Sequence, residues 1–347
     1  MPKKVNSLLS KSKAQKERYG MLILAGDIGG TSTRLAYFDT TGGALEPVVE
    51  KRFPSRESGS LEEIITLFAA EQGMIAESAC FGIAGPVRNG HVRTPNLPWS
   101  VDSALLAGIL GLRSVRLLND LEANAYGIDL LGPDDLIVLN PGVPDPAGTI
   151  AVVSAGTGLG EALAYWDGTT HRPLSSEGGH ADFAPRNALE AELLLFLRDE
   201  YGRVSTERIV SGPGLCNIYR FLRDARRLPE TATVAKAMRV KDPAAVISGA
   251  ALAGECQLCG QALDLFVSLY GAEAGNVSLR VLATGGMYLG GGIAPKIIDR
   301  LKEPGFMMAF CAKGRLSPLL ENIPVQVILN ERTALLGAAR CAVIGQY

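Results

Sequence analysis

The chain has 347 residues, which is enough for two domains of ordinary size, and hydrophobic residues make up 47% of it against 20% charged residues. Its formal net charge of −2 argues against nucleic acid as the main partner, and no apolar run reaches the length of a membrane-spanning helix. The six cysteines are irregularly spaced, which does not indicate a disulfide-stapled secreted scaffold, so we expect a cytoplasmic protein.

Residues 1–21 form a basic leader, because the first 20 residues contain six lysines and arginines and a single acid, Glu17. The segment lacks the apolar stretch of a secretory signal. A transit peptide is an alternative, but such peptides favour arginine over lysine. We therefore expect a solvated, disordered tail.

Strand-like and helix-like segments alternate after the leader, as in an α/β protein. Apolar segments typical of strands occur at 22–26, 34–39, 79–85 and 114–120. Residues 60–70 have the periodicity of an amphipathic helix. A connection at 132–148, which contains proline and glycine, precedes a new apolar strand that begins at Thr149.

The segment after Thr149 resembles the first two strands. Residues 25–38 (AGDIGGTSTRLAYF) and 153–166 (VSAGTGLGEALAYW) both run from an apolar strand through a glycine turn into Leu-Ala-Tyr and an aromatic residue, at an offset of 128 residues. Two unrelated β-hairpins with glycine turns would show the same pattern. If the likeness is a repeat, the chain contains two related α/β halves, and two backbone loops could grip a phosphate chain.

The second half continues with further alternation. Its expected elements are a helix at 188–200, a long helical region at about 249–280, a glycine-dense segment at 284–295, a strand at 324–329 and a helix rich in small residues after that strand. In the first of these helices, Leu189, Leu193, Phe196 and Leu197 fall on one face.

The first glycine turn is a candidate phosphate loop. Glycines let backbone N–H groups approach phosphate oxygens, and the hydroxyl of Thr31 adds a donor. Asp27 would repel a phosphate unless a cation stood between them, so we expect it to anchor Mg²⁺ through water. The turn matches neither a Walker A motif nor a dinucleotide fingerprint. The candidate nucleotide-binding residues here are Gly26, Asp27, Ile28, Gly29, Gly30 and Thr31.

Asn119 and Asp120 end the apolar run that starts at Ser114. A carboxylate at the tip of a strand can accept a proton from a substrate hydroxyl, which makes Asp120 a candidate general base. Asp120 could equally be the N-cap of the helix that follows. The residues alone leave both interpretations open.

Glu177 and His180 flank two glycines in the segment SSEGGHADFAP and so can converge on one small polar ligand. Neutral sugars require such groups, because each ring hydroxyl both donates and accepts hydrogen bonds. Zinc is a rival ligand for Glu177, His180 and Asp182, but the helical H-E-x-x-H spacing is absent. Glu207, taken alone, has the pattern of an acid in the first turn of a helix.

Two further motifs are less specific. Gly285 and Gly286, with a second cluster at 290–292, could let an adenine and a ribose lie flat on the backbone, or could form loops that bind nothing. Cys256 and Cys259 form a C-x-x-C motif without the other ligands that zinc needs, so we expect no metal there.

Taken together, the motifs GDIGGT, IAGPV, LLNDLEA, AGTGLG, EGGHADFAP and ERIVSGPG resemble, in their order, those of the bacterial-type glucokinase family. This family is part of the hexokinase, actin and heat-shock chaperone ATPase group, and the likeness runs from about residue 22 to the end. The ROK branch carries a cysteine-rich zinc motif after its sugar-binding histidine. The chain departs from that branch, because ADFAPRNALEAE follows His180 here.

The resemblance implies an α/β fold of two ribonuclease-H-like (actin/hexokinase-type) domains with an interdomain cleft. The small domain would contain residues 22–130 plus 327–347, and the large domain residues 131–326. It also implies Mg²⁺- and ATP-dependent phosphorylation of glucose at its 6-hydroxyl, and a homodimer that binds neither nucleic acid nor membrane.

The same resemblance implies individual roles. It implies a first phosphate loop at 26–31, a second at Gly156, Thr157 and Gly158, adenosine contacts at Gly285 and Gly286, glucose contacts at Asn119, Asp120, Glu177, His180 and Glu207, and Asp120 as the catalytic base. Asn96, in the segment TPNLPW, is a weaker candidate contact. Alternatives are a kinase for another hexose or an N-acetyl hexosamine, a non-enzymatic actin-like or sugar-sensing protein, and ADP or polyphosphate as the donor.

Overall fold

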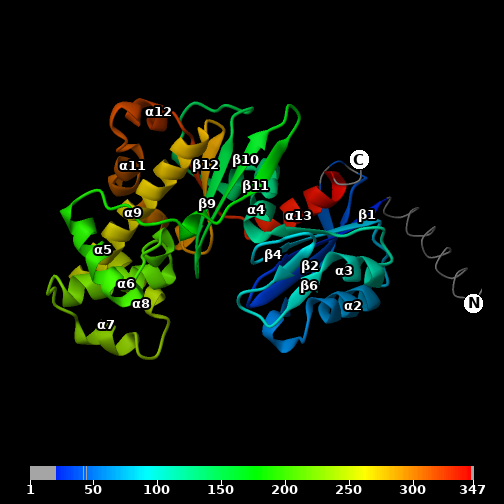
Figure 1. Ribbon diagram of the computed structural model, residues 1–347, viewed down its shortest axis with the longest axis horizontal. Coiled ribbons are helices and arrows are strands. Elements are labelled where there is room, and N and C mark those ends of the chain that lie inside the picture. The colour runs from blue at the N-terminus through cyan, green and yellow to red at the C-terminus, as the bar shows by residue number, and fades with distance from the viewer. Residues whose placement is uncertain (1–20, 42, 44, 345–347) are drawn as a thin grey trace, which may run out of the picture. The chain divides into compact units, whose positions relative to one another are not determined.

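The computed structural model describes residues 21–41, 43 and 45–344. It divides into two compact units: the first contains the described residues up to Leu131 and from Glu331 onward, and the second runs from Gly132 to Asn330. Figure 1 shows that each unit is built on its own sheet. Apart from Met21, the predicted leader lies outside the described residues.

The sheet of the first unit has five strands in the order β3-β2-β1-β4-β7. Strands β1, β2 and β3 pair antiparallel, whereas β4 runs parallel to β1 and β7 runs parallel to β4. The elements of this unit are β1 (Leu22–Ile28), β2 (Ser32–Asp39), β3 (Glu46–Pro54), η1 (Ser55–Glu57), α2 (Leu61–Gln72), β4 (Ser78–Ile83), β5 (His91–Arg93), β6 (Ser100–Asp102), α3 (Ser103–Leu110), β7 (Arg116–Asn119), α4 (Asp120–Gly127), η2 (Ile128–Leu130) and α13 (Thr333–Ile344).

Both faces of this sheet are buried, which explains why its strands have nearly continuous apolar sequences. Alternate residues of β1 belong to two separate cores, one shared with α2 and α3 and the other with α4 and α13. A Cβ on Gly337 of α13 would overlap the carbonyl oxygen of Ala123 in α4. The small residues of the C-terminal helix are therefore needed for the close approach of these two helices.

The sheet of the second unit has six strands in the order β11-β10-β9-β12-β13-β8. Its elements are η3 (Pro133–Asp135), β8 (Leu136–Asn140), β9 (Ile150–Ala155), β10 (Leu159–Trp166), β11 (His171–Ser175), η4 (Gly178–His180), α5 (Ala188–Tyr201), η5 (Thr206–Arg208), α6 (Gly212–Asp224), α7 (Ala232–Ala237), α8 (Pro243–Leu252), α9 (Gln257–Val281), β12 (Gly286–Gly290), η6 (Ala294–Ile297), α10 (Ile298–Leu301), α11 (Pro304–Cys311), η7 (Gly314–Leu316), α12 (Ser317–Glu321) and β13 (Val325–Ile328).

Five strands of each sheet share one topology. In the second unit, β9, β10 and β11 pair antiparallel, and β12 and β13 continue the sheet parallel to β9, as β4 and β7 do beside β1. Strand β8 is an additional antiparallel edge strand. The predicted fold class is confirmed, and the similar segments at 25–38 and 153–166 form equivalent hairpins, which supports their origin as a repeat.

Two boundaries differ from the sequence-based expectation. The domain boundary expected between residues 326 and 327 would cut β13, whereas the compact units divide after Asn330. The helical region expected at 249–280 consists of two helices, α8 and α9, because Gly254 adopts a left-handed conformation with φ of 69°. Cys256 is consequently the N-cap of α9 rather than part of its interior.

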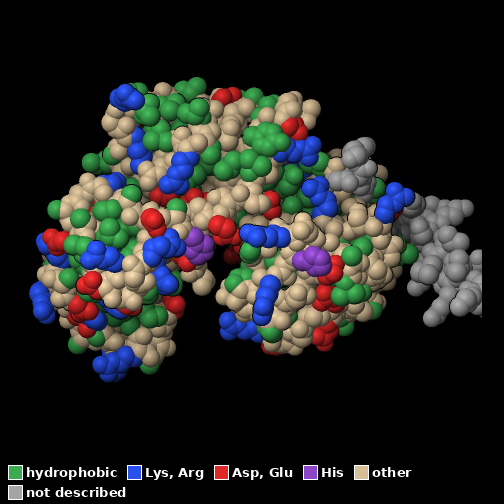
Figure 2. All heavy atoms as spheres, in the orientation of Figure 1, with side chains coloured by type: hydrophobic (Ala, Val, Ile, Leu, Met, Phe, Trp, Pro, Cys, Tyr) green, Lys and Arg blue, Asp and Glu red, His purple; other side chains and the backbone are tan. Residues whose placement is uncertain are grey.

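The surface of the second unit carries charges of both signs. Figure 2 shows lysine, arginine and acidic side chains interspersed over the region of α5, α6 and α7, where Arg220 pairs with Glu200 and Arg226 with Glu192. This mixture matches a chain with a net charge near zero. Within the described ranges, no helix has both the length and the apolar character needed to cross a bilayer.

Candidate active site

In the first unit, the candidate residues gather at one edge of the sheet. The last residue of β1, Ile28, is level with Ile83 at the end of β4, and Ile83 is level with Asn119 at the end of β7. Because these strands are parallel, the glycine loop at 29–31 and Asp120 leave the sheet at the same edge. The structure therefore brings together the predicted phosphate loop and the predicted base.

The first glycine loop is held by a buried serine that the sequence analysis missed. The Gly29 N–H donates to the carbonyl of Ser32 (3.0 Å) and so closes the turn. Ser55 spans the turn, because its hydroxyl donates to the carbonyl of Gly29 (2.8 Å) and its N–H to that of Thr31 (3.0 Å). The segment FPSRE has the composition of an ordinary turn, so nothing in it pointed to this contact.

Asn96 also lies against the first loop. A Cβ on Gly30 would be only 2.8 Å from the Cβ of Asn96, which is tighter than an ordinary contact. Glycine at this position therefore allows the segment around Asn96 to approach the loop. The weaker sequence candidate is thus next to the predicted phosphate loop.

Asp27 has the electrostatics expected of a cation ligand. Burial raises the pKa of its carboxyl group to about 6, and the nearby Arg52 offsets this only in part. Within the described part of the chain, no residue donates a hydrogen bond to this carboxylate. A divalent cation would compensate a charge that the protein leaves poorly solvated, so Asp27 fits the predicted role.

Asn119, not Asp120, is the N-cap of α4. The Asn119 side-chain oxygen accepts the N–H of Leu121 (2.9 Å), and its amide nitrogen donates to the carbonyl of Gly85 (3.1 Å). Glu122 completes a capping box by accepting the N–H of Asn119 (2.8 Å). This excludes the N-cap interpretation of Asp120, which is the first residue of the helix.

In the second unit, the glycine loop at 156–158 is tied to the segment that contains Glu207. The Gly212 N–H donates to the carbonyl of Gly156 (2.8 Å), and the Leu159 N–H donates to the carboxylate of Glu207 (2.9 Å). A Cβ on Gly158 would lie 2.5 Å from that carboxylate oxygen. Glu207 therefore fixes the end of the loop, a role that its sequence context did not indicate.

The turn with Glu177 and His180 rests directly on β10. A Cβ on Gly179 would overlap the carbonyl oxygen of Leu159, so only glycine permits this approach. The Thr206 N–H donates to the carbonyl of Ala181 (2.9 Å), which joins the turn to the segment of Glu207. The structure thus brings Glu177, His180 and Glu207 to one region beside the loop at 156–158.

The zinc alternative for this turn is not supported. The Asp182 carboxylate is paired with Arg203 (2.7 Å), which also donates to the carbonyl of His180 (2.9 Å). Across the residues described here, no group of three histidine, cysteine or acidic side chains could hold a metal ion.

The two glycine clusters near β12 lie at opposite ends of that strand. Gly286 is level with Ile150 at the start of β9, whereas Gly290 is level with Ser154, next to the loop at 156–158. The separation is about 13 Å, at roughly 3.3 Å per residue. The position of Gly285 and Gly286 therefore does not favour the predicted adenosine contacts, whereas the position of the cluster at 290–292 favours such contacts.

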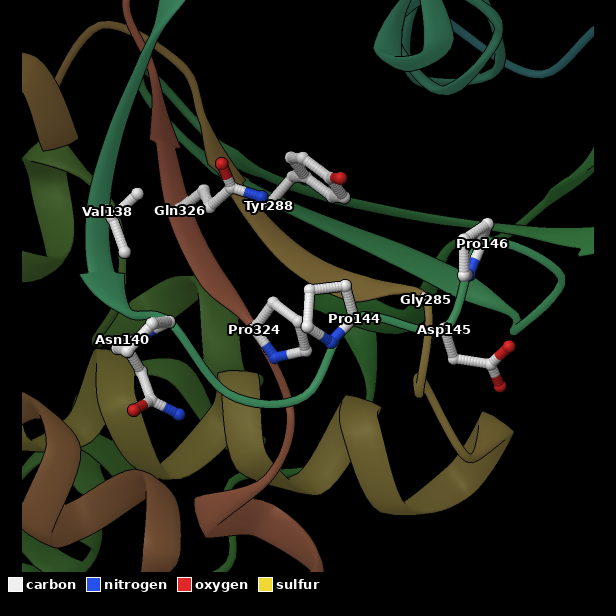
Figure 3. Close-up of a pocket in the computed structure, with 10 residues that line it drawn as sticks. Val138, Asn140, Pro144, Asp145, Pro146, Gly285, Tyr288, Pro324 and Gln326 are labelled. Atoms are coloured by element: carbon white, nitrogen blue, oxygen red, sulfur yellow. The ribbon is translucent and has the colours of Figure 1, made fainter. Parts of the chain in front are cut away.

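Gly285 instead lines a pocket of about 400 Å³ in the second unit. Figure 3 shows Tyr288 and Gln326, on neighbouring strands, together with Pro144 and Pro324 around this pocket. Asp145 is the only charged lining residue, and its carboxylate accepts the hydroxyl of Thr284 (2.8 Å). A pocket without a cationic side chain is poorly suited to a triphosphate.

Comparisons with known proteins match this chain to one family over nearly its whole length. The sequence profile of a family described as Glucokinase matches residues 24–344. A glucokinase from Nostoc sp. (strain PCC 7120) is 42% identical over 337 residues, which cover 92% of this chain and 98% of that relative. A glucokinase from Psychromonas ingrahamii is 38% identical, with coverage of 91% and 95%.

Solved structures agree with the sequence relatives. The crystal structure of a glucokinase from an Antarctic psychrotroph has a TM-score of 0.82 at 32% identity and covers 93% of this chain and 99% of that one. A ROK-family glucokinase from Streptomyces griseus, in complex with glucose and AMPPNP, has a TM-score of 0.64 at 20% identity, with coverage of 93% and 100%. The second likeness shows the shared fold alone.

Proposed function

Because this chain belongs to the glucokinase family, we propose that it transfers a phosphoryl group from ATP to the 6-hydroxyl of glucose. The observation that carries the proposal is the grouping of the candidate residues. In each unit, a glycine loop lies beside polar side chains suited to a sugar: Asp120 in the first, and Glu177, His180 and Glu207 in the second.

Asp120 is proposed as the general base. It would accept the proton of the 6-hydroxyl as that oxygen attacks the terminal phosphorus, and ADP would leave with the bridging oxygen. The capping box of Asn119 fixes the start of α4 and with it the position of Asp120. Glu177, His180 and Glu207 would orient the sugar hydroxyls.

The backbone N–H groups of the loops at 29–31 and 156–158 would bind the phosphates. Asp27 would hold Mg²⁺, as its poorly compensated carboxylate supports. Bound Mg²⁺ neutralises charge on the phosphate oxygens. For the adenosine group we propose the segment at 290–292, because it lies at the same end of the sheet as the second loop.

A coupled assay that records ADP formation on adding glucose tests this proposal. We expect turnover with glucose, ATP and Mg²⁺, and much lower kcat/KM with mannose, fructose and N-acetylglucosamine. Replacement of ATP by ADP or polyphosphate, with glucose 6-phosphate as the readout, identifies the donor. The absence of glucose-dependent product from folded protein with every donor would refute the proposal.

Two finer expectations accompany the proposal from the family resemblance. The first is a homodimer, which light scattering at micromolar concentration tests. The second is a cytoplasmic location, which fractionation of the source cells tests.

A further inference from the structure

Glu161 is a buried acid that lies behind the turn at 177–180. It belongs to β10, close to the second glycine loop, and only 4% of its surface is exposed. Its carboxylate faces the turn, because a Cβ on Gly178 would overlap Oε2 of Glu161 and lie 2.9 Å from its Cδ. Glycine at position 178 therefore lets the main chain of the turn rest on this carboxyl group.

The Glu161 carboxyl group lies near that of Glu273, on α9, because Nη1 of Arg280 is 3.9 Å from Oε2 of Glu161 and 3.0 Å from Oε1 of Glu273. Two ionised carboxylates around one guanidinium repel each other, which opposes the ionisation of Glu161. Glu273 accepts hydrogen bonds from Arg280 (3.0 Å) and Asn276 (2.9 Å). Oε1 of Glu161 is buried and has no hydrogen-bond partner among the described residues, so an ionised carboxylate would be poorly compensated there.

The surroundings of the pair favour the neutral form of Glu161. Burial raises the pKa of its carboxyl group to about 7, and the charge of Glu273 adds to this, whereas Arg280 opposes it. The Arg280 guanidinium is 3.9 Å from Glu161 and half exposed, so its compensation is partial. The neighbouring elements add Glu177 and His180 on the turn, and Lys313, which donates to Asn276 (2.6 Å).

We propose that Glu161 is a positioning residue for the sugar-binding turn at 177–180. Its neutral carboxyl group supports the turn at Gly178, and its ionisation beside Glu273 displaces the turn. The inference rests on the proposed function, because it takes the turn at 177–180 as a sugar contact. On ionisation the proton leaves to solvent, and a second negative charge is buried next to Glu273. The main chain at Gly178 then moves away, and Glu177 and His180 move with it.

The expected signature is a rise in the KM for glucose above neutral pH. Between pH 6.5 and 8.5 the neutral fraction of an acid that titrates near 7 falls by more than tenfold, so KM should rise by about tenfold. The kcat should change much less, because the proton transfer is assigned to Asp120.

The test compares glucose KM and kcat from pH 6 to 9 in the full chain and in two variants. Glu161→Gln keeps a neutral hydrogen-bond donor of the same shape, so its KM should be nearly flat with pH. Glu192→Gln, at an exposed carboxylate paired with Arg226, is the matched control and should follow the wild type. His180 is unchanged in all three proteins. If the KM for glucose rose equally with pH in every one of them, a group other than Glu161 would cause the pH dependence, and the proposal would be overturned.

A second measurement does not depend on catalysis. The Tm of the wild type, relative to Glu161→Gln, should fall as pH rises from about 4.5 to 7 and then level off. The reason is that Glu161 ionises at a lower pH in the unfolded chain than in the folded protein. A pH-independent difference in Tm would overturn the protonated state of buried Glu161 even if the protein phosphorylates glucose. Conversely, the expected Tm profile in a protein without kinase activity would refute the proposed function alone.

If Glu161→Gln does not fold, infrared difference spectra of Asp27→Asn between pH 6 and 8 serve instead, because the carboxyl group of Asp27 itself has a pKa of about 6. They should show the loss of one protonated carboxyl band. Its absence would overturn the proposal.

Discussion

Replacing Gly179 by alanine should weaken sugar recognition by changing the turn rather than any side chain that touches the sugar. A Cβ at this position would overlap the carbonyl oxygen of Leu159 and lie 3.0 Å from its carbonyl carbon and 3.1 Å from its Cβ. Carbon atoms pack at about 3.5 to 4.0 Å. Because the tightest obstacle is this carbonyl oxygen in the backbone of β10, the turn itself must retreat by roughly 1 Å.

Such a retreat predicts two effects. Overpacking of this kind costs about 1–3 kcal/mol of unfolding free energy. A displacement approaching 1 Å at Glu177 and His180 should lower kcat/KM for glucose by on the order of 10²-fold. The KM for ATP should change less, because the glycine loop at 156–158 retains its contacts with Glu207 and Gly212.

Chemical denaturation and initial rates at varied glucose measure both effects. Gly178→Ala is the informative comparison, because its Cβ would meet the flexible end of Glu161, so we expect a smaller loss. Gly249→Ala is the control: it lies in α8 with nothing within 4 Å and should stabilise the helix by about 0.5–1 kcal/mol. If Gly179→Ala retains kcat/KM within twofold of the wild type, the close packing of the turn has no functional role.

Three further predictions concern the first unit. Asp120→Asn should reduce kcat by on the order of 10²- to 10⁴-fold while calorimetry still detects glucose binding; near-normal kcat would remove Asp120 from the role of base. Asp27→Asn should be more stable than the wild type at pH 7.5, by at most about 3 kcal/mol, because the raised pKa of Asp27 means that folding opposes its ionisation. The advantage should vanish as pH falls from about 6 to below 4, and an advantage that is constant with pH in urea titrations would contradict the burial of this charge. Ser55→Ala should cost about 1–2 kcal/mol and raise the KM for ATP severalfold, since the Gly29 carbonyl loses its donor, and an unchanged KM would show that the loop is held by other contacts.

Local sequence pattern was sufficient to predict the first hairpin of each sheet and strands β4, β7 and β13, but not β3, β8, β11 or β12. Apolar runs such as 22–26 and 114–118 are continuous because both sheet faces are covered, and glycines mark where each hairpin turns. The turn at 177–180 was also recognisable, because a histidine beside two glycines is unusual in this chain.

What the sequence did not reveal depends on contacts between distant segments. Gly285 and Gly286 have the same composition as the cluster at 290–292, and only the register of β12 against β9 separates them. Ser55 and Glu161 act through partners that lie 26 and 112 residues away along the chain. Neither has a local pattern that distinguishes it from a turn serine or a strand acid.

We propose that this chain makes glucose 6-phosphate with Asp120 as the base. The most direct test is to incubate glucose, ATP and Mg²⁺ with the wild type and with Asp120→Asn, and to identify the phosphorylated position by nuclear magnetic resonance. We expect phosphate on the 6-oxygen with the wild type and almost none with the variant at equal glucose occupancy. A different phosphorylated position, or equal product from the two proteins, would contradict it.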